Sequence, residues 1–432
     1  MDKLIIQGGR PLRGVIPIQG SKNACLPIMA ATLLAEAPCT LHGVPKLADI
    51  DALGVLLEEL GVSVERRQRT LKLAVTDRSN CHARYELVRK MRASICVLGP
   101  LLARRGYARV SMPGGCAIGA RPVDLHLRGL ATLGAKIELD GGDVVARCQR
   151  LRGAEVFMGG PFGSTVLGTA NVMMAAALAE GTTIIECAAC EPEVEDLANF
   201  LNAMGARILG GGTPRIIIQG VESLSGCTHT VIPDRIEAGT FMCAAAITNG
   251  QVSLEPVRLD HLMAVVDRLR AVGVFVEKTA TGVEIFSARQ LVPADVTTQP
   301  YPGFPTDLQA QFMALTCLAE GNSVITEKIF PDRFLHVAEL SRMGAQIRKE
   351  GPTAVVTGCK RLIGAPVMAS DLRASAALVL AGLAAVGQTT VSRIYHLDRG
   401  YERIEERLCA VGADIQRVPD EVAIPQLAGA VA

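Results

Sequence analysis

LHVAELSRMGAQIR, residues 335–348, contains the pattern that decides the fold of this chain. Leu335 to Met343 place apolar side chains at helical spacing, and Gly344 follows where a left-handed residue commonly ends a helix. Ala345 to Arg348 then predict a short strand. The stretch therefore predicts an amphipathic helix, a tight turn and a strand in direct succession.

The same phrase recurs six times along the 432 residues. Its glycines are Gly61, Gly134, Gly205, Gly273, Gly344 and Gly412, which lie 73, 71, 68, 71 and 68 positions apart. A second motif recurs at the same spacing. It consists of an Ala/Leu-rich helical run, such as Ala310 to Leu318, followed by a turn and a β-branched stretch. Its turns lie at Ala37, Gly106, Gly181, Asn249–Gly250, Gly321 and Gly387. Because two independent motifs recur six times with the same period, the sequence predicts six repeats of about 70 residues.

Helices and strands alternate within each repeat, which is typical of α/β or α+β packing. A chain of this length is also too long for one ordinary core. We therefore expect two domains of three repeats each, with the chain crossing between them near Gly20–Lys22 and Thr230–Asp234. The first domain would span 22–232. The second would combine 1–21 with 233–432, so that the first twenty residues complete its sheet.

The composition excludes several classes of protein. A formal net charge of +1 argues against a general nucleic-acid binder. The longest uncharged stretch, Ala374 to Gly387, falls short of the roughly 20 residues that cross a bilayer. No charged and then apolar leader precedes Leu4, and 13 scattered cysteines predict reduced thiols. We expect a cytoplasmic protein without membrane insertion; its protein partners stay open.

Cationic side chains occur in the first turns of several apolar helices. They are Lys22, Arg92, Arg235 and Arg373. A cation there opposes the helix dipole by roughly 0.3–1 kcal/mol. Each could reach back to solvent or to a neighbouring carboxylate, but for the set we favour an anion-binding site.

One loop favours a reactive cysteine. In SMPGGCAIGARPVDLH, residues 111–126, Pro113 and two glycines oppose helix and strand and place Cys116 on a loop. Arg121 could lower the pKa of this thiol and favour the nucleophilic thiolate. A buried, inert side chain is the expectation for the other cysteines.

Two further motifs place polar side chains at helix starts. In QGSKNACLP, residues 19–27, Ser21 is a candidate N-cap that would direct Lys22 and Asn23 out of the first turn. In PGFPTDLQAQF, residues 302–312, Thr306 is a candidate N-cap and Asp307 follows it. Asp307 could be a plain partner of the helix dipole or a general base.

The C-terminal part adds Asp371 and Arg373 in SDLRASAALVLAG, residues 370–382, and Arg399 in RIYHLDRGYERIEERL, residues 393–408. Guanidinium groups suit bidentate capture of carboxylate and phosphate. Each of these residues alone is weak support for a site.

Together these motifs, with RKMRASICVLGPLLAR at 89–104, resemble the UDP-N-acetylglucosamine 1-carboxyvinyltransferases of the enolpyruvyl transferase family. The resemblance covers nearly the whole chain. It implies a two-domain inside-out α/β barrel that needs no metal or organic cofactor. The implied reaction moves the enolpyruvyl group of phosphoenolpyruvate to the 3-hydroxyl of UDP-N-acetylglucosamine through a tetrahedral phosphoketal, the first committed step of peptidoglycan synthesis.

The resemblance also implies residue roles. Lys22 and Asn23 would hold phosphoenolpyruvate, with Arg121 and Arg399 on its phosphate and carboxylate. Asp307 would take the proton of the sugar hydroxyl, and Cys116 would donate a proton or form a covalent adduct. The implied nucleotide-sugar contacts are Arg92, Arg121, Pro122, Val123, Asp124, Leu125, Asp307 and Ile329, and the implied supporting residues are Arg333, Asp371 and Arg373.

One segment departs from the family pattern. A Ser-Val-Gly-Ala-Thr-like run is common near the uridine, but this chain has PFGSTVLGTANVMMAA at 161–176. Ser164 and Gly168 are its candidate nucleotide contacts, and the register stays open. Two other functions also stay open: a shikimate-phosphate enolpyruvyl transferase, disfavoured by Cys116, and a non-catalytic sensor of sugar nucleotides.

Overall fold

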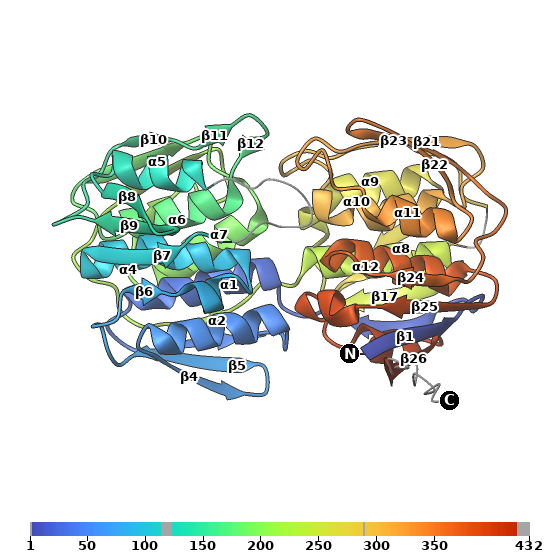
Figure 1. Cartoon of the computed structure of the whole chain (residues 1–432), viewed down its shortest axis with the longest axis horizontal. Coiled ribbons are helices and arrows are strands. Elements are labelled where there is room, and N and C mark those ends of the chain that lie inside the picture. The colour runs from blue at the N-terminus through green and yellow to red at the C-terminus, as the bar shows by residue number, and fades with distance from the viewer. Residues whose placement is uncertain (1, 114–122, 288–289, 421–432) are drawn as a thin grey trace, which may run out of the picture.

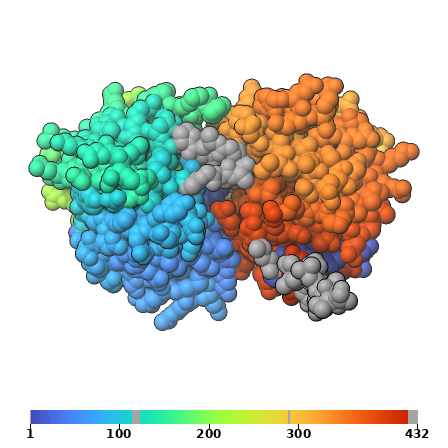
Figure 2. All heavy atoms as spheres, in the orientation of Figure 1, coloured from blue at the N-terminus to red at the C-terminus, as the bar shows by residue number. Residues whose placement is uncertain are grey.

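The computed structural model describes residues 2–113, 123–287 and 290–420, and these residues form two lobes (Figure 1). Each lobe has its own hydrophobic core. The core of lobe one runs from Ala24 to Val231. The core of lobe two combines residues between Leu4 and Ile18 with residues between Ile236 and Ile415. Figure 2 shows lobe one in blue to green and lobe two mainly in orange and red.

Lobe one carries three described four-stranded sheets, with strand orders β16-β3-β5-β4, β6-β7-β9-β8 and β10-β13-β15-β14. In each, the first pair of strands is parallel and the other two pairs are antiparallel. The strands are β3 (Cys39–His42), β4 (Val62–Arg67), β5 (Thr70–Val75), β6 (His82–Ala83), β7 (Tyr107–Ser111), β8 (Lys136–Asp140), β9 (Asp143–Arg147), β10 (Glu155–Phe157), β13 (Thr182–Glu186), β14 (Arg207–Leu209), β15 (Arg215–Gln219) and β16 (Thr228–Thr230), with the small hairpin β11 (Gly159–Gly160) and β12 (Gly163–Ser164).

Lobe two repeats the arrangement among its described residues, with orders β2-β17-β19-β18, β20-β21-β23-β22 and β24-β25-β1-β26. Its strands are β1 (Asp2–Gln7), β2 (Arg13–Pro17), β17 (Gln251–Glu255), β18 (Phe275–Lys278), β19 (Val283–Phe286), β20 (Val296–Thr297), β21 (Asn322–Thr326), β22 (Gln346–Glu350), β23 (Thr353–Thr357), β24 (Pro366–Met368), β25 (Gln388–Ser392) and β26 (Asp414–Pro419).

The helices divide into two sets. The central helices are buried along most of their length: α1 (Lys22–Ala31), α4 (Leu98–Arg105), α6 (Val166–Ala176), α8 (Arg235–Ile247), α10 (Gln309–Thr316) and α12 (Leu372–Ala384). The other helices are α2 (Ala48–Glu59), α5 (Asp124–Thr132), α7 (Pro192–Ala203), α9 (Met263–Ala271), α11 (His336–Arg342) and α13 (Ile404–Cys409), of which α7 is also mostly buried and packs on α1. Shorter turns are α3 (Tyr85–Val88), η1 (Thr32–Leu34), η2 (Arg92–Val97), η3 (Leu259–His261), η4 (Thr306–Leu308) and η5 (Ile394–Arg399).

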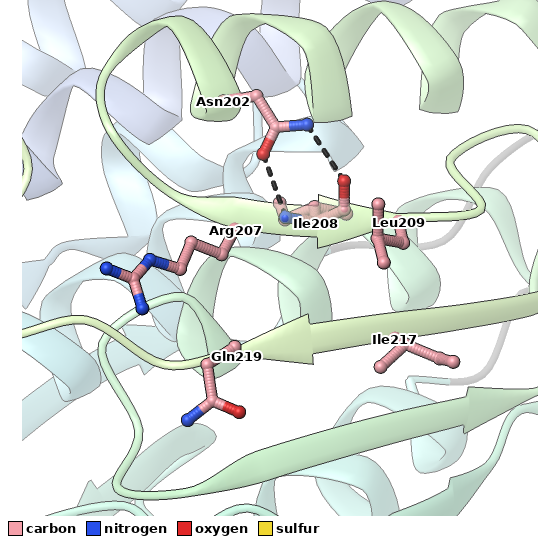
Figure 3. Close-up of a pocket in the computed structure, with 6 residues that line it drawn as sticks. All are labelled: Asn202, Arg207, Ile208, Leu209, Ile217 and Gln219. Atoms are coloured by element: carbon pink, nitrogen blue, oxygen red, sulfur yellow. Dashed lines mark hydrogen bonds between the residues drawn. The ribbon is translucent and has the colours of Figure 1, made fainter.

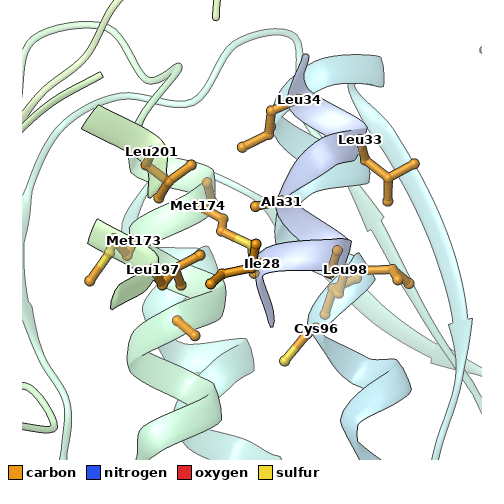
Figure 4. Packing of buried hydrophobic residues seen from close by; sticks show 14 of the residues in the cluster. Ile28, Ala31, Leu33, Leu34, Cys96, Leu98, Met173, Met174, Leu197 and Leu201 are labelled. Atoms are coloured by element: carbon orange, nitrogen blue, oxygen red, sulfur yellow. The ribbon is translucent and has the colours of Figure 1, made fainter. Parts of the chain in front are cut away.

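Packing between central helices fills each lobe, while the sheets lie toward the outside (Figure 1). In lobe two, α8, α10 and α12 all pack against one another. In lobe one, α1 packs on α6 and α7, and Figure 4 shows Ile28 beside Met174 and Leu197 in this core. A helix that is apolar on every side must be buried on every side, so these helices are expected at the center of each lobe.

The predicted helix–turn–strand segment is confirmed with small shifts at its ends. The helix predicted over 335–343 is α11, and the strand predicted over 345–348 is β22, Gln346–Glu350. The helix predicted over 310–318 is α10, Gln309–Thr316. The six glycines of the repeated phrase all have positive φ angles: Gly61 (85°), Gly134 (96°), Gly205 (106°), Gly273 (96°), Gly344 (92°) and Gly412 (103°).

The chain passes between the lobes in two neighbouring segments. β2 pairs with β17 of lobe two, and α1 of lobe one begins a few residues later. On the return, β16 pairs with β3 of lobe one before α8 begins lobe two. Gly20 and Pro233 form a β-bridge between the two crossings. Within the described residues no helix is both long and apolar enough to span a bilayer.

The central helices should dominate stability. Leu378 of α12 is 0% exposed, whereas Leu209 of β14 is 70% exposed. Leu378→Ala should lower the free energy of unfolding by about 2–5 kcal/mol, because it leaves a cavity inside the helix layer. Leu209→Ala is the control and should change it by less than about 0.5 kcal/mol. Urea unfolding measures both, and equal effects of the two substitutions would contradict a helix-centered core.

Candidate functional site

The start of α1 lies at the junction of the lobes. The Ser21 hydroxyl accepts a hydrogen bond from the Ala24 amide at 3.3 Å, so the predicted N-cap is confirmed. The Lys22 amide donates to Asp234 Oδ2 at 3.1 Å, and Asp234 also caps α8 of lobe two. One carboxylate therefore ties the first turns of two central helices together. Asn23 follows as the second residue of α1 and is partly buried.

Asp49 joins two of the predicted substrate-binding cations. Its carboxylate lies 3.2 Å from Lys22 Nζ and 2.9 Å from Arg399 Nε, although Arg399 belongs to lobe two. Asp49 is 4% exposed. We did not predict a role for Asp49, because an aspartate in the first turn of an amphipathic helix usually serves the helix dipole.

Asp307 is held by two arginines. Arg333 Nη1 lies 2.8 Å from Oδ1, and Arg373 Nη2 lies 3.0 Å from Oδ2. The prediction that Thr306 is an N-cap was wrong. Thr306 opens the 3-10 turn η4 ahead of α10, and its hydroxyl donates to Glu327 Oε2 at 2.9 Å. The Thr306 hydroxyl, which the local pattern predicted to cap the helix, is instead hydrogen-bonded to Glu327, a residue distant in the sequence.

The charges at the junction shift one another's pKa values. Burial lowers the pKa of Lys22, and Arg373 and Arg399 lower it further against the opposing effect of Asp49 and Asp307. Burial would raise the pKa of Asp307, but Arg373, Arg333 and Lys22 hold it well below its ordinary value. The Asp49 and Asp307 groups therefore lie within electrostatic reach of the same lysine.

The remaining supporting residues lie at the start of α12. Asp371 is its N-cap and accepts from the amides of Arg373 and Ala374 at 2.9 and 3.2 Å. The Arg373 guanidinium also lies over the Tyr401 ring, 5.4 Å from its center. Asp371 thus fixes the helix start from which Arg373 reaches Asp307.

Carboxylates of the protein balance the cations at the helix starts. Lys22 pairs with Asp49, Arg373 with Asp307, and Arg235 with Glu193 at 3.0 Å. For these three cations the neighbouring-carboxylate interpretation is confirmed, and a bound anion is not required to explain their positions.

The predicted nucleotide contacts of lobe one gather around α5. Asp124 and Leu125 are its first residues, and Val123 precedes them. Burial lowers the pKa of His126, the third residue, to about 3, and the charge of Arg92 contributes. Arg92 is the first residue of η2, so η2 and α5 lie close together.

The hairpin β11–β12 extends this region toward lobe two. A Cβ atom added to Gly160 would lie 3.1 Å from Leu125, and one added to Gly163 would lie 2.7 Å from Pro300 of lobe two. Ser164 ends the hairpin. The Gly168 amide already donates to the Thr165 hydroxyl at 3.2 Å, which leaves it engaged within the start of α6.

Ile329 follows β21 in lobe two, and its amide donates to Glu327 Oε1 at 2.8 Å. Cys116, Arg121 and Pro122 lie outside the described residues. The structure thus brings Lys22, Arg399 and Asp307 into one charged junction.

Surface hollows lie elsewhere. One of about 460 Å³ on lobe one is lined by residues of α7, β14 and β15, among them Asn202, Leu209 and Ile217 (Figure 3). Asn202 bonds the backbone of Ile208 there, so its amide is already used. A second hollow of about 230 Å³ lies on lobe two, with Asp267 and Phe304 in its lining. Neither hollow is lined by a predicted site residue.

Asp49 should stabilise the folded protein in a pH-dependent way. Burial would raise its pKa, but Lys22 and Arg399 outweigh burial and lower it. Its contribution is therefore complete above the ordinary pKa near ~3.9 and is lost as pH falls through the lower folded value. Asp49→Asn should cost about 3 kcal/mol at pH 7, because the buried Lys22 and the partly exposed Arg399 lose their shared partner. This difference should shrink below about pH 4.

Asp51, in the same helix, provides the matched control. Its side chain is 68% exposed and lies 3.6 Å from Arg66. Asp51→Asn should change the free energy of unfolding by less than about 1 kcal/mol, as is typical of exposed ion pairs. Urea unfolding at pH 7, 5 and 3.5 measures all three proteins. A loss for Asp49→Asn no larger than for Asp51→Asn would rule out the bridging role of Asp49.

Comparison with known proteins assigns the fold and the family. A family model described as EPSP synthase (3-phosphoshikimate 1-carboxyvinyltransferase) matches residues 6–408. In solved structures, the enolpyruvyl transferase NikO from Streptomyces tendae superposes with a TM-score of 0.87 at 27% identity, covering 96% of this chain and 99% of NikO. EPSP synthase from Acinetobacter baumannii superposes at 0.75 with 20% identity, covering 97% and 100%, which shows a shared fold.

Curated relatives are closer in sequence. The UDP-N-acetylglucosamine 1-carboxyvinyltransferase of Nitratidesulfovibrio vulgaris strain DP4 is 58% identical, over 96% of this chain and 99% of the relative. The one of Methylacidiphilum infernorum is 55% identical, over 98% and 100%. The chain is therefore a mixed α/β transferase that belongs to the UDP-N-acetylglucosamine 1-carboxyvinyltransferase family of enolpyruvyl transferases.

Proposed function

We propose that this chain transfers the enolpyruvyl group of phosphoenolpyruvate to the 3-hydroxyl of UDP-N-acetylglucosamine and releases phosphate. The observation that carries the proposal is the junction in which Lys22 and Arg399, from different lobes, meet on Asp49 beside Asp307. The identity of 55–58% to relatives named for this activity supports the choice of acceptor.

The junction is suited to anionic substrates. Lys22, Arg399, Arg333 and Arg373 are four cations, and Asp49 and Asp307 are the two carboxylates they contact. These cations would attract the phosphate and carboxylate of phosphoenolpyruvate, with Lys22, Asn23, Arg121 and Arg399 as its ligands. Fixed cations in a buried site also stabilise the charge that develops in an addition–elimination reaction.

Asp307 is the proposed general base, and it can act as one only if the arginines that contact it are displaced. A carboxylate with a strongly lowered pKa is a weak base. Both of its oxygens are engaged by Arg333 and Arg373. We propose that the anionic groups of bound substrate draw these guanidinium groups away and so raise the basicity of Asp307 toward the sugar hydroxyl. Cys116 would then protonate the enol carbon or form a covalent adduct with phosphoenolpyruvate.

The nucleotide sugar would bind along the border of the lobes. Arg92 and the segment from Arg121 to Leu125 would contact its diphosphate and sugar, and Ile329 would lie near the uracil. The proximity of α5 to the hairpin β11–β12, and of Gly163 to Pro300, supports one continuous surface for these contacts. Ser164 and Gly168 would belong to the same surface.

We further propose that the lobes are two domains, 22–232 and 1–21 with 233–432. The two separate cores and the recurring strand order support three repeats in each domain of an inside-out α/β barrel. A reaction of this kind, in a chain with many unpaired cysteines, would take place in the cytoplasm.

Phosphate release from phosphoenolpyruvate tests the reaction and the acceptor. Release should require UDP-N-acetylglucosamine, and shikimate 3-phosphate should not replace it. Cys116→Ser should lower the rate of phosphate release at least about tenfold. This is a lower bound, because a positioned proton donor usually contributes 10²–10⁴-fold to the rate. Release with shikimate 3-phosphate alone would favour the alternative acceptor, and release with neither would favour a non-catalytic sensor.

Cys409→Ser is the matched control, because Cys409 is exposed at the end of α13. It should keep the wild-type rate. Cys116→Asp separates two roles of the loop cysteine: an aspartate can still donate a proton, so retained activity supports an acid, and lost activity supports a covalent nucleophile.

A further inference from the structure

Glu327 is a buried carboxylate for which the proposed mechanism has no role. It follows directly after β21 and is 0% exposed. Thr298 Oγ1 donates to its Oε1 at 2.7 Å, as do the amides of Ile329 and Phe330 at 2.8 and 2.9 Å. Thr306 Oγ1 donates to its Oε2 at 2.9 Å. Because burying a carboxylate is costly unless it is well hydrogen-bonded, this convergence of donors calls for an explanation beyond local packing.

The two oxygens of Glu327 serve different segments. Oε1 holds the backbone of 329–330 and the end of β20 through Thr298. Thr298 Oγ1 in turn accepts from the Lys328 amide at 2.9 Å, which closes the turn on both sides. Oε2 instead holds Thr306, the residue that precedes Asp307. The side chain therefore joins two stretches that lie on opposite sides of helix α10 in the sequence.

The connection continues from Thr306 to Asp307. Arg333 Nη1 donates to Thr306 Oγ1 at 3.0 Å and to Asp307 Oδ1 at 2.8 Å. All four neighbours of Glu327 act as donors, so its side chain serves only as an acceptor. The Thr306 hydroxyl must direct its hydrogen at Glu327, and its lone pairs are then free to receive Arg333. Glu327 thereby sets the orientation of Thr306, and Thr306 sets the position of Arg333.

We propose that Glu327 is a positioning residue that couples the Ile329 segment to the Asp307–Arg333 pair. The roles of the coupled groups rest on the proposed function; the coupling itself rests on the hydrogen bonds. A sugar nucleotide that contacts Ile329 would act, through one buried side chain, on the carboxylate that faces its hydroxyl. Binding of the correct acceptor and positioning of the base are then parts of one network.

Glu327→Gln tests the coupling with little change in shape. The amide oxygen can keep the three donors at Oε1, but the amide nitrogen faces Thr306 and donates where the carboxylate accepted. The Thr306 hydroxyl then loses the acceptor that fixed its hydrogen, and its two lone pairs are shared between the new amide and Arg333. The direction from which Thr306 receives Arg333 is no longer fixed by Glu327. We expect kcat to fall at least about tenfold, since small misplacements of reacting groups cost up to 10² in rate. KM for UDP-N-acetylglucosamine should change less than about threefold.

Substitutions at Thr306 provide a rescue. Thr306→Val should reproduce the fall in kcat, and Thr306→Ser, which keeps the hydroxyl, should restore most of it. Thr353→Val is the control: its hydroxyl contacts only that of Thr326 among the described hydrogen bonds, at 3.3 Å on the neighbouring strand. This variant should keep kcat within about twofold, as expected for a surface-strand substitution outside the network.

A second readout does not depend on turnover. Hydrogen–deuterium exchange of the peptide containing Ile329 and Phe330 should accelerate in Glu327→Ala, because both amides lose their acceptor, but much less in Glu327→Gln. Wild-type kcat in Glu327→Gln, or no rescue by Thr306→Ser, would overturn the coupling, as would unchanged exchange in Glu327→Ala. An inactive wild type with the expected exchange pattern would instead reject the proposed function and leave the positioning role intact.

Discussion

The need to bury helices that are apolar on every side governs this structure. In lobe two, α8, α10 and α12 pack on one another, and comparable helices fill lobe one. Because the sides of these helices are covered by apolar neighbours, polar side chains can be accommodated mainly at the first turns. Lys22, Asp307 and Arg373 all occupy such first turns or the turn just before them. The packing that stabilises the lobes therefore also collects the charges that the proposed chemistry uses.

Collecting cations at helix starts works against the helix dipole, and the chain offsets this with carboxylates that contact the cations. Asp49 bridges Lys22 and Arg399, and Asp307 bridges Arg333 and Arg373. A bridge of this kind keeps two guanidinium or ammonium groups close without substrate. In the proposed function, a phosphate or carboxylate of the substrate would compete for the same donors. In the proposed mechanism, such competition would reconcile the low pKa of Asp307 with its role as a base.

The local sequence patterns correctly predicted those features that depend on neighbouring residues alone. The helix α11 and the left-handed glycines depend on spacing within a few residues, and both are confirmed. The Thr306 cap failed because Glu327, 21 residues away, offers a buried acceptor that no local pattern reveals. Asp49 was missed for the same reason, since Arg399 is 350 residues distant. Lys22, Asp307 and Arg373 stood out in the sequence through their places at helix starts, whereas the meeting of Lys22 and Arg399 on Asp49 depends on contacts between the lobes.

The place of β1 has a consequence for how the chain can fold during synthesis. Lobe one is continuous in sequence, so it can finish folding as soon as β16 has been made. β1 precedes lobe one in the sequence, yet its neighbours β25 and β26 are the last two strands of lobe two among the described residues. β1 must therefore remain without these partners while lobe one and most of lobe two are translated, with its edges open to wrong partners. A chaperone at the ribosome that covers β1 during this interval would keep its edges from pairing wrongly.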